Sequence, residues 1–466
     1  MFHQTHELRC RGSSEQEPRC NLISNWGYHR EDHLPASTVS SYPPRLRNGN
    51  PCREEAAVTE WQAKRLEIEI ETEATGGLLV EFLLRAARAV ATGDWALATE
   101  ALATLGGMIS PRGDAAERVG THFANALVSK MTRRLHSSTK GYCAQQIQQL
   151  QQKNSSHDPE DRFHAYLALN KLTPFIRFAH LTANQAILEA VEMAEEIHIV
   201  DLDIMQGVQW PPLMQALTVR AGGPPRLLSI TGMGSSVAVL NKTGARLTNF
   251  ANSLGIPFAF HTLPGGIEAL TPASLRRKGG EALVVNSMMQ LPRLLENDTA
   301  TLRSVLQAVH LLAPEVVTVA ERHFSPRRNL NGYHQFLETF SEALRHYSAI
   351  FDSLDATLPP TSLDRLSIEE SWLGKEIVEL ICLQDTVSTE NCEQNLHWKV
   401  FMERVGFKIA SQSEFAMAQA RLLLKLCYPA DGYQLVADAA GCLLLGWQNT
   451  PLFSVSAWKQ HPVQGL

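Results

Sequence analysis

The sequence lacks the features that mark several common classes of protein. Its 466 residues carry a formal net charge of −6, so the concentrated positive charge that non-specific nucleic-acid binding requires is missing. Its eight cysteines form no CxxC pair, which argues against a zinc site and a disulfide framework. There is no apolar signal segment and no run near the roughly 20 apolar residues that cross a bilayer. We therefore expect a soluble, intracellular protein without a membrane anchor.

Local catalytic signatures are also missing. The chain contains no GxSxG elbow, no P-loop and no HExxH helix, and no cysteine lies in a recognisable nucleophile motif. The sequence thus predicts no catalytic residues and no metal site, and nothing in it requires an enzyme.

The remaining composition, 44% apolar and 19% charged, is typical of a globular protein large enough for two lobes. Residues 1–74 are rich in Ser, Pro, Arg, Glu and Asn, which predicts a disordered extension. Residues 75–195 show helical patterns on both sides of a polar, Gln-rich stretch at 136–158, which predicts an all-helical cap. The first helix of this cap has an apolar stripe formed by Leu79, Leu83, Ala87 and Val90. Part of this stripe could bind a partner.

Residues 196–466 alternate between strand and helix patterns. The segment IHIVDLDIMQGVQWPPLMQAL at 197–217 reads as a buried strand, a polar turn and a helix that accepts Pro211 and Pro212 in its first turn. Further strands are predicted at 226–231, 258–262, 282–286 and 316–321, with helices at 240–254, 299–312 and 331–354. This alternation predicts an α/β fold with a doubly wound, mostly parallel, Rossmann-like sheet.

The end of the chain follows a different pattern. After a predicted helix at 413–427, three short strands are expected at 433–437, 442–447 and 452–458. The QNTP turn between the last two predicts an antiparallel hairpin at the sheet edge.

Such a sheet with an antiparallel end is typical of S-adenosylmethionine methyltransferases, which need a glycine-rich first turn and an acid after the second strand. Here the first turn has one glycine, and Thr231-Gly232-Met233-Gly234 has no carboxylate, so we expect no cofactor. Asp201 and Asp203 could form an acid/base or metal pair, but carboxylates that accept hydrogen bonds from nearby loops are the more ordinary interpretation. A vestigial crevice would lie beside Asp201, Asp203, Gln206, Gly232 and Asn286.

Several long strings resemble the plant GRAS family, in order, across about residues 77–460. The string IHIVD resembles that family's VHIID box, LLVEFLLRAARAVATGDWALATEALATL its first leucine-rich region, and GWQNTPLFSVSAW its SAW motif. TPFIRF, DLDIMQG and WLGKEI are most similar to the lateral suppressor branch, which acts in axillary meristem initiation. The motif residues are Ile197, His198, Ile199, Val200, Asp201, Ser456, Ala457 and Trp458.

The resemblance implies a methyltransferase-like core with a helical cap, used as a regulator of transcription in the nucleus, with the cytoplasm as a second location. The implied partners are zinc-finger transcription factors and other GRAS proteins, in homo- or heterodimers, with promoter DNA contacted directly or through partners. Direct sequence-specific DNA binding is the alternative; its candidate contacts are Arg133, Arg134, Arg276, Arg277 and Lys278. A third alternative is a small-molecule binder or methyltransferase that uses the crevice.

Overall fold

In the computed structural model, the described residues are 76–138, 159–275, 279–291, 294, 299–323, 332–383, 398–428, 430–438 and 441–460. The predicted disordered extension at 1–74 lies outside them.

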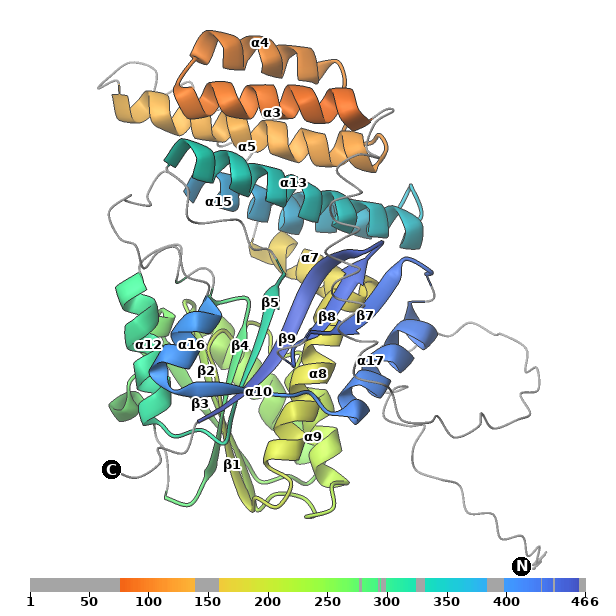
Figure 1. The fold of residues 1–466 in the computed structure, drawn as a ribbon. Coiled ribbons are helices and arrows are strands. Elements are labelled where there is room, and N and C mark those ends of the chain that lie inside the picture. The colour runs from red at the N-terminus through yellow and green to blue at the C-terminus, as the bar shows by residue number, and fades with distance from the viewer. Residues whose placement is uncertain are drawn as a thin grey trace, which may run out of the picture. The chain divides into compact units, whose positions relative to one another are not determined.

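The described residues form a nine-stranded sheet in the order β3-β2-β1-β4-β5-β9-β8-β7, with β6 also paired to β9 (Figure 1). Five strands are parallel: β1 (Glu196–Asp201), β2 (Leu227–Gly234), β3 (Phe258–Pro264), β4 (Ala282–Met288) and β5 (Val316–Arg322). Four pair antiparallel: β6 (Phe407–Ala410), β7 (Tyr433–Ala437), β8 (Leu443–Trp447) and β9 (Thr450–Gln460). The predicted fold class is confirmed, although the four-residue β6 was missed.

Helices cover both faces of the parallel strands, because alternate strand residues are apolar on each side. On one face, Ile197 and Ile199 of β1 pack with α8 (Pro174–Ala190), α9 (Trp210–Thr218) and α10 (Val237–Ser253). On the other, Val200 packs in a cluster with α12 (Thr299–Leu311) and α16 (Trp398–Val405). A last helix, α17 (Glu414–Cys427), packs on α8 and on the edge strand β7. The predicted helices at 240–254, 299–312 and 413–427 are therefore present.

The helical cap is built from two separate parts of the chain. The first part is α3 (Gly76–Thr92), α4 (Trp95–Gly106) and α5 (Ala115–Ser138). The second part is α13 (Gly332–Thr357), which packs against α3 and α5, and α15 (Gly374–Leu383), which packs against α5 (Figure 1). The predicted boundary near residue 195 therefore differs from the structure in two ways: α13 and α15 join the cap, and α8 packs on the sheet.

A short connection between α13 and α15 carries an unusual helix. The connection consists of α14 (Leu363–Ser367) and the unusual helix, a π-helix named η3 (Ile368–Leu373); both pack against α7 (Pro159–Leu172). Helices with π geometry are rare and often lie at functional sites, where the extra residue per turn redirects side chains.

A charged cluster fastens the two parts of the cap together. The Arg118 guanidinium of α5 donates to Glu369 Oε2 at 3.0 Å and to Asp355 Oδ1 at 2.7 Å. Arg365 donates to the same Asp355 oxygen at 2.6 Å. Burial opposes the charged form of Arg118, but the hydrogen bond and charge of Asp355, with Glu369, outweigh it and hold the pKa of Arg118 above its usual value.

The predicted partner-binding stripe requires a correction. Leu79 is 5% exposed, and the side chains of Leu83, Ala87 and Val90 have no exposed surface. They pack in the core of the cap because α4, α5 and α13 lie around α3. A partner could not reach these four residues without opening the cap.

Candidate functional site

The carboxyl ends of β1, β4 and β5 hold a buried network of amides. Asn286 of β4 donates to Gln209 Oε1 at 3.2 Å and to Asp201 Oδ1 at 3.3 Å. Gln209, directly before α9, also exchanges hydrogen bonds with Asn184 of α8, and Thr318 of β5 donates to Asn286 at 2.9 Å. The network therefore fixes three strands and two helices relative to one another, since a buried amide left without partners would be costly.

Asp201 is part of this network. The Trp210 indole donates to its Oδ2 at 2.9 Å, which attaches the first turn of α9 to the end of β1. Burial and then the neighbouring charge of Asp203 raise the pKa of Asp201 to about 7, against the hydrogen bonds from Asn286 and Trp210. The ordinary interpretation of Asp201, a carboxylate that accepts hydrogen bonds from nearby elements, is confirmed.

The turn that would hold a methyl donor is filled by the protein itself. Ile204 is 3% exposed, and its backbone N–H donates to the Met233 carbonyl at 3.0 Å. A Cβ on Gly232 would lie 2.9 Å from the Ile204 side chain, so this side chain occupies the space above β2. Gln206 points elsewhere, because its side-chain oxygen and its carbonyl accept hydrogen bonds from Arg246 of α10. The five predicted crevice residues thus do not converge on one open site.

The two family motifs lie in the sheet. Within the IHIVD string, His198 is buried between Glu281 Oε2 at 3.1 Å and Thr231 Oγ1 at 2.8 Å, while Ile197, Ile199 and Val200 are core residues. In β9, the buried Trp458 indole donates to Ser456 Oγ at 2.9 Å, and Ala457 lies opposite Thr318 of β5. Both motifs therefore stabilise strands, and neither exposes a reactive group.

One cavity lies between the sheet and the cap. It has a volume of about 290 Å³ and is lined by residues that follow β1, β4 and β5, together with residues of α7, α8, η3 and α15. Because the strand order reverses between β1 and β4, this is the place where open α/β sheets bind ligands. Of the five predicted crevice residues, only Asp203 lines it.

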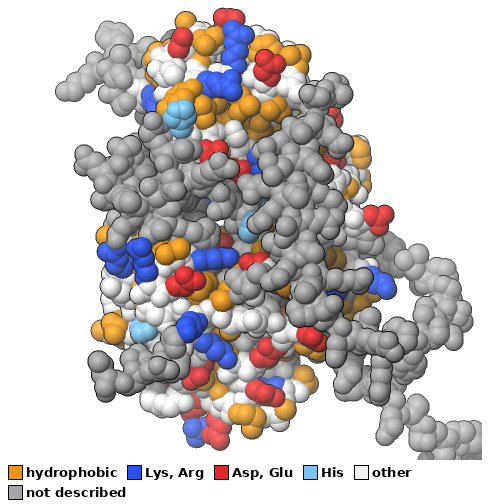
Figure 2. Space-filling view, viewed as in Figure 1, with side chains coloured by type: hydrophobic (Ala, Val, Ile, Leu, Met, Phe, Trp, Pro, Cys, Tyr) orange, Lys and Arg blue, Asp and Glu red, His pale blue; other side chains and the backbone are white. Residues whose placement is uncertain are grey.

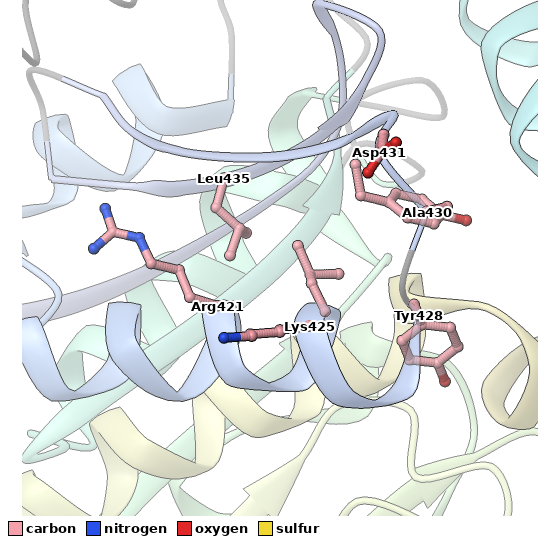
Figure 3. A pocket seen from close by; sticks show the side chains of 8 residues that line it. Arg421, Lys425, Tyr428, Ala430, Asp431 and Leu435 are labelled. Carbon is pink, nitrogen blue, oxygen red and sulfur yellow. The ribbon is translucent and has the colours of Figure 1, made fainter. Parts of the chain in front are cut away.

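A second, more open hollow of about 480 Å³ lies at the sheet edge between α17 and β7 (Figure 3). Arg421 and Lys425 come from α17, and Leu435 comes from β7, which among the described residues pairs only with β8. Beside it, α17 exposes three large apolar side chains at helical spacing: Phe415 (60%), Leu422 (40%) and Leu426 (60%). This surface was not predicted from the sequence, although Phe415, Leu422 and Leu426 are apolar positions outside the buried stripe of α17 and so indicated a second apolar face.

The predicted DNA contacts are dispersed. Arg133 is exposed on α5, whereas Arg134 donates to the carbonyls of Val90 and Ala91 at the end of α3. Arg276, Arg277 and Lys278 lie outside the described residues. On the face in Figure 2, cationic side chains of the described residues are interspersed with acidic ones.

Two kinds of feature are absent from the described ranges. No helix there has both the length and the apolar character of a membrane span. In the same ranges, no three His, Cys, Asp or Glu side chains are placed together as metal ligands.

The fold defines a class of scaffold. It combines a Rossmann-like sheet, whose cofactor turn is filled by its own side chains, with a two-part helical cap. Comparison with known sequences identifies it: the GRAS domain family model matches residues 79–459, and the chain belongs to that family. Scarecrow-like protein 18 of Arabidopsis thaliana is 41% identical, covering 82% of this chain and 91% of its own length. Protein MONOCULM 1 of Oryza sativa subsp. japonica is 38% identical, covering 81% and 88%.

A solved structure agrees with the fold. The crystal structure of SCL7 of Oryza sativa has a TM-score of 0.67 and 34% identity, covering 82% of this chain and 99% of that one. The predicted family is therefore confirmed, and with it a plant developmental regulator as the general function.

Proposed function

We propose that this chain is a regulator of transcription, present in the nucleus and also in the cytoplasm, that performs no catalysis and binds DNA-bound transcription factors. Zinc-finger proteins and other GRAS proteins are the proposed partners, promoter DNA is reached through them, and axillary meristem development is the proposed setting. Membership of the GRAS family supports the proposal. So does the filled cofactor turn, since Ile204 stands where a methyl donor would need open space.

The observation that carries the proposal is the exposed face of α17, formed by Phe415, Leu422 and Leu426. Large apolar side chains exposed together on one helix face are typical of binding surfaces. Arg421 and Lys425 are exposed beside them, with Asp431 as the acidic residue of the same hollow. We therefore propose that this face binds a transcription-factor segment that carries both apolar and acidic side chains.

The test uses point variants of the full chain, because removing residues 75–195 would also remove α8 from the sheet. Phe415→Glu with Leu426→Glu should abolish co-purification of zinc-finger transcription factors from shoot tissue and lower output from a reporter gene. Leu363→Glu is the matched control, since Leu363 is 80% exposed on α14, away from α17. Unchanged recovery of the transcription factors with the double variant would refute the proposal.

A further inference from the structure

The outer strand β7 leaves one edge of the sheet open. It is the last strand in the sheet order and, among the described residues, pairs only with β8. Such a strand presents backbone N–H and C=O groups that a further strand can bind, and proteins usually protect it with a charged residue, a proline or a bulge. The five residues of β7, Tyr-Gln-Leu-Val-Ala, include no charge and no proline, and their pairing with β8 has no bulge. This edge is therefore unprotected.

Two hydrogen bonds show which backbone groups of β7 face β8. Directly after β7, the Asp438 N–H donates to the Cys442 carbonyl at 2.9 Å. Directly before it, the Gly432 carbonyl accepts a hydrogen bond from the Gln448 N–H at 2.9 Å. In an antiparallel pair, residues that exchange hydrogen bonds alternate with residues that do not. The even-numbered residues of β7 therefore bond to β8, and the odd-numbered residues direct their backbone groups to the open edge.

Leu435 and Ala437 supply the outward backbone groups. Among the described residues, neither their N–H nor their C=O groups have a hydrogen-bond partner outside the β7–β8 pairing. The N–H of Tyr433, the third odd-numbered residue, donates to the Ala430 carbonyl at 3.4 Å. The free stretch thus includes Leu435 and Ala437, which is enough for a short added strand to form several backbone hydrogen bonds.

The hollow beside this edge carries two cations. Arg421 and Lys425 of α17 line it and are exposed, and neither forms an ion pair with an acid of the described residues. Asp431 is the acidic residue of the lining, so the positive charges outnumber the negative one. In Figure 3, the Leu435 side chain extends from β7 toward the stretch of α17 that carries both cations. An acidic segment at the edge would therefore meet complementary charge.

The spacing of the two cations matches that of an extended strand. Arg421 and Lys425 are four residues apart, which is about 6 Å along a helix. Alternate residues of a strand lie on one face, about 6.8 Å apart. In a strand added to β7, the side chains on the Leu435 face would lie over the cations, whereas the residue between them would lie on the Val436 face. Two acidic residues separated by one apolar residue fit this arrangement.

We propose that the edge of β7 is a strand-addition site. An extended partner segment with the order acidic, apolar, acidic bonds to the backbone of Leu435 and Ala437, and its two carboxylates lie at Arg421 and Lys425. That the segment belongs to a transcription factor rests on the proposed function. The apolar face of α17 lies beside this site, so one partner can contact both.

The test is isothermal titration calorimetry of the full chain with the peptide acetyl-Ser-Val-Glu-Val-Glu-Val-Ser-amide and two N-methylated forms. One form is methylated at both glutamate nitrogens and the other at the nitrogens of the last two valines. Because alternate N–H groups of a strand point in opposite directions, only one form can block pairing with β7. We expect the unmethylated peptide to bind with a Kd below about 1 mM. One methylated form should bind at least tenfold weaker, and the other should keep its affinity within threefold.

Variants of the protein test the two halves of the site separately. Ala437→Pro removes an outward N–H and should weaken peptide binding about tenfold with little change in the melting temperature, because proline is tolerated where an edge N–H faces solvent. Lys425→Gln should weaken binding about three- to tenfold, since it removes one of the two charges. Lys242→Gln is the matched control, because Lys242 is exposed on α10, and it should leave the affinity unchanged.

The outcomes separate this proposal from the proposed function. Equal affinity of the two methylated forms, no saturable heat up to 5 mM peptide, or unchanged affinity in both Ala437→Pro and Lys425→Gln would overturn strand addition. If Phe415→Glu with Leu426→Glu still abolished recovery of the transcription factors, the proposed function would remain. Dimerisation of the chain that the peptide reverses would identify a second copy of β7 as the occupant and would also overturn the proposal.

Discussion

The joint between the two parts of the cap gives the sharpest prediction. Replacing Arg118 by Met removes the guanidinium that links α5 to Asp355 of α13 and Glu369 of η3. The Arg118 side chain is 2% exposed and that of Glu369 is 1% exposed, so the substitution leaves a carboxylate in the interior. We expect the cap to lose stability while the sheet remains folded.

The structure sets the size of this loss. Removing one partner of a buried ion pair costs about 3–5 kcal/mol, because the remaining charge is desolvated without compensation. Arg365 stays 3.7 Å from Glu369, which places the expected cost near 3 kcal/mol, the lower end of that range. Adding Glu369→Leu removes the stranded charge, so the double variant should be more stable than the sum of the two single effects predicts.

Hydrogen exchange is the suitable assay, because a chain of this size does not unfold in one step. Protection of α5 and α13 should fall in Arg118→Met, whereas protection of β1 and β4 should not. Arg85→Met is the matched control: its ion pair with Glu100 is exposed, at 46% and 68%, so its loss should cost less than about 1 kcal/mol. Unchanged protection in Arg118→Met, or strictly additive effects in the double variant, would refute the reasoning.

Three further predictions concern the sheet. Because the pKa of Asp201 is raised to about 7, the folded chain keeps a proton that the unfolded chain releases above pH 4. The free energy of unfolding should therefore fall between pH 4 and 7, by up to about 4 kcal/mol. Denaturation curves at pH 5 and 8 should show this fall in the unchanged chain and not in Asp201→Asn. Gly244→Ala should lower the melting temperature at a cost of about 1–3 kcal/mol, because its Cβ would lie 2.4 Å from the Phe260 ring; an unchanged melting temperature would contradict the close packing of α10 on β3. The β8–β9 turn places Gln448 and Asn449 at φ 43° and 67°, so Gln448→Asn with Asn449→Gly should stabilise the chain by about 1 kcal/mol in chemical denaturation, and a loss of stability would count against this turn geometry.

The sheet could be predicted from the sequence because each parallel strand is a short apolar run rich in β-branched residues. The run at 197–202 is one example, and β1 occupies Glu196–Asp201. The short strand β6 was missed because four residues carry too little periodicity to separate a strand from a loop.

The composition of the cap could not be predicted in the same way. The stripe of α13, which includes Phe336, Phe340 and Leu344, shows that one face is buried but does not show what covers it. In an alternating pattern the sheet is the expected neighbour, whereas α13 packs on α3 and α5 as well as on β8 and β9. The same limit explains Leu79 and Leu83: their spacing predicted an apolar face, and only the neighbouring helices decide whether it is core or surface.

The cavity between sheet and cap lies at the carboxyl ends of the parallel strands, but of the predicted crevice residues only Asp203 lines it. The carboxyl end of β1 follows from the strand and turn pattern, and Asp203 was identified there. Tyr166, Trp372 and Met289 were not, because they lie far apart in the sequence and only the tertiary structure brings them to one cavity.

The position of β9 has a consequence for how the protein is made. This strand is the last element described, yet it lies inside the sheet between β5 and β8, with Trp458 buried against the core. During translation, the ribosome must release residues up to about 460 before the interior edge of β5 acquires its neighbour. A stop codon only a few codons before residue 450 would therefore be as damaging to the folded scaffold as one placed much earlier in the gene.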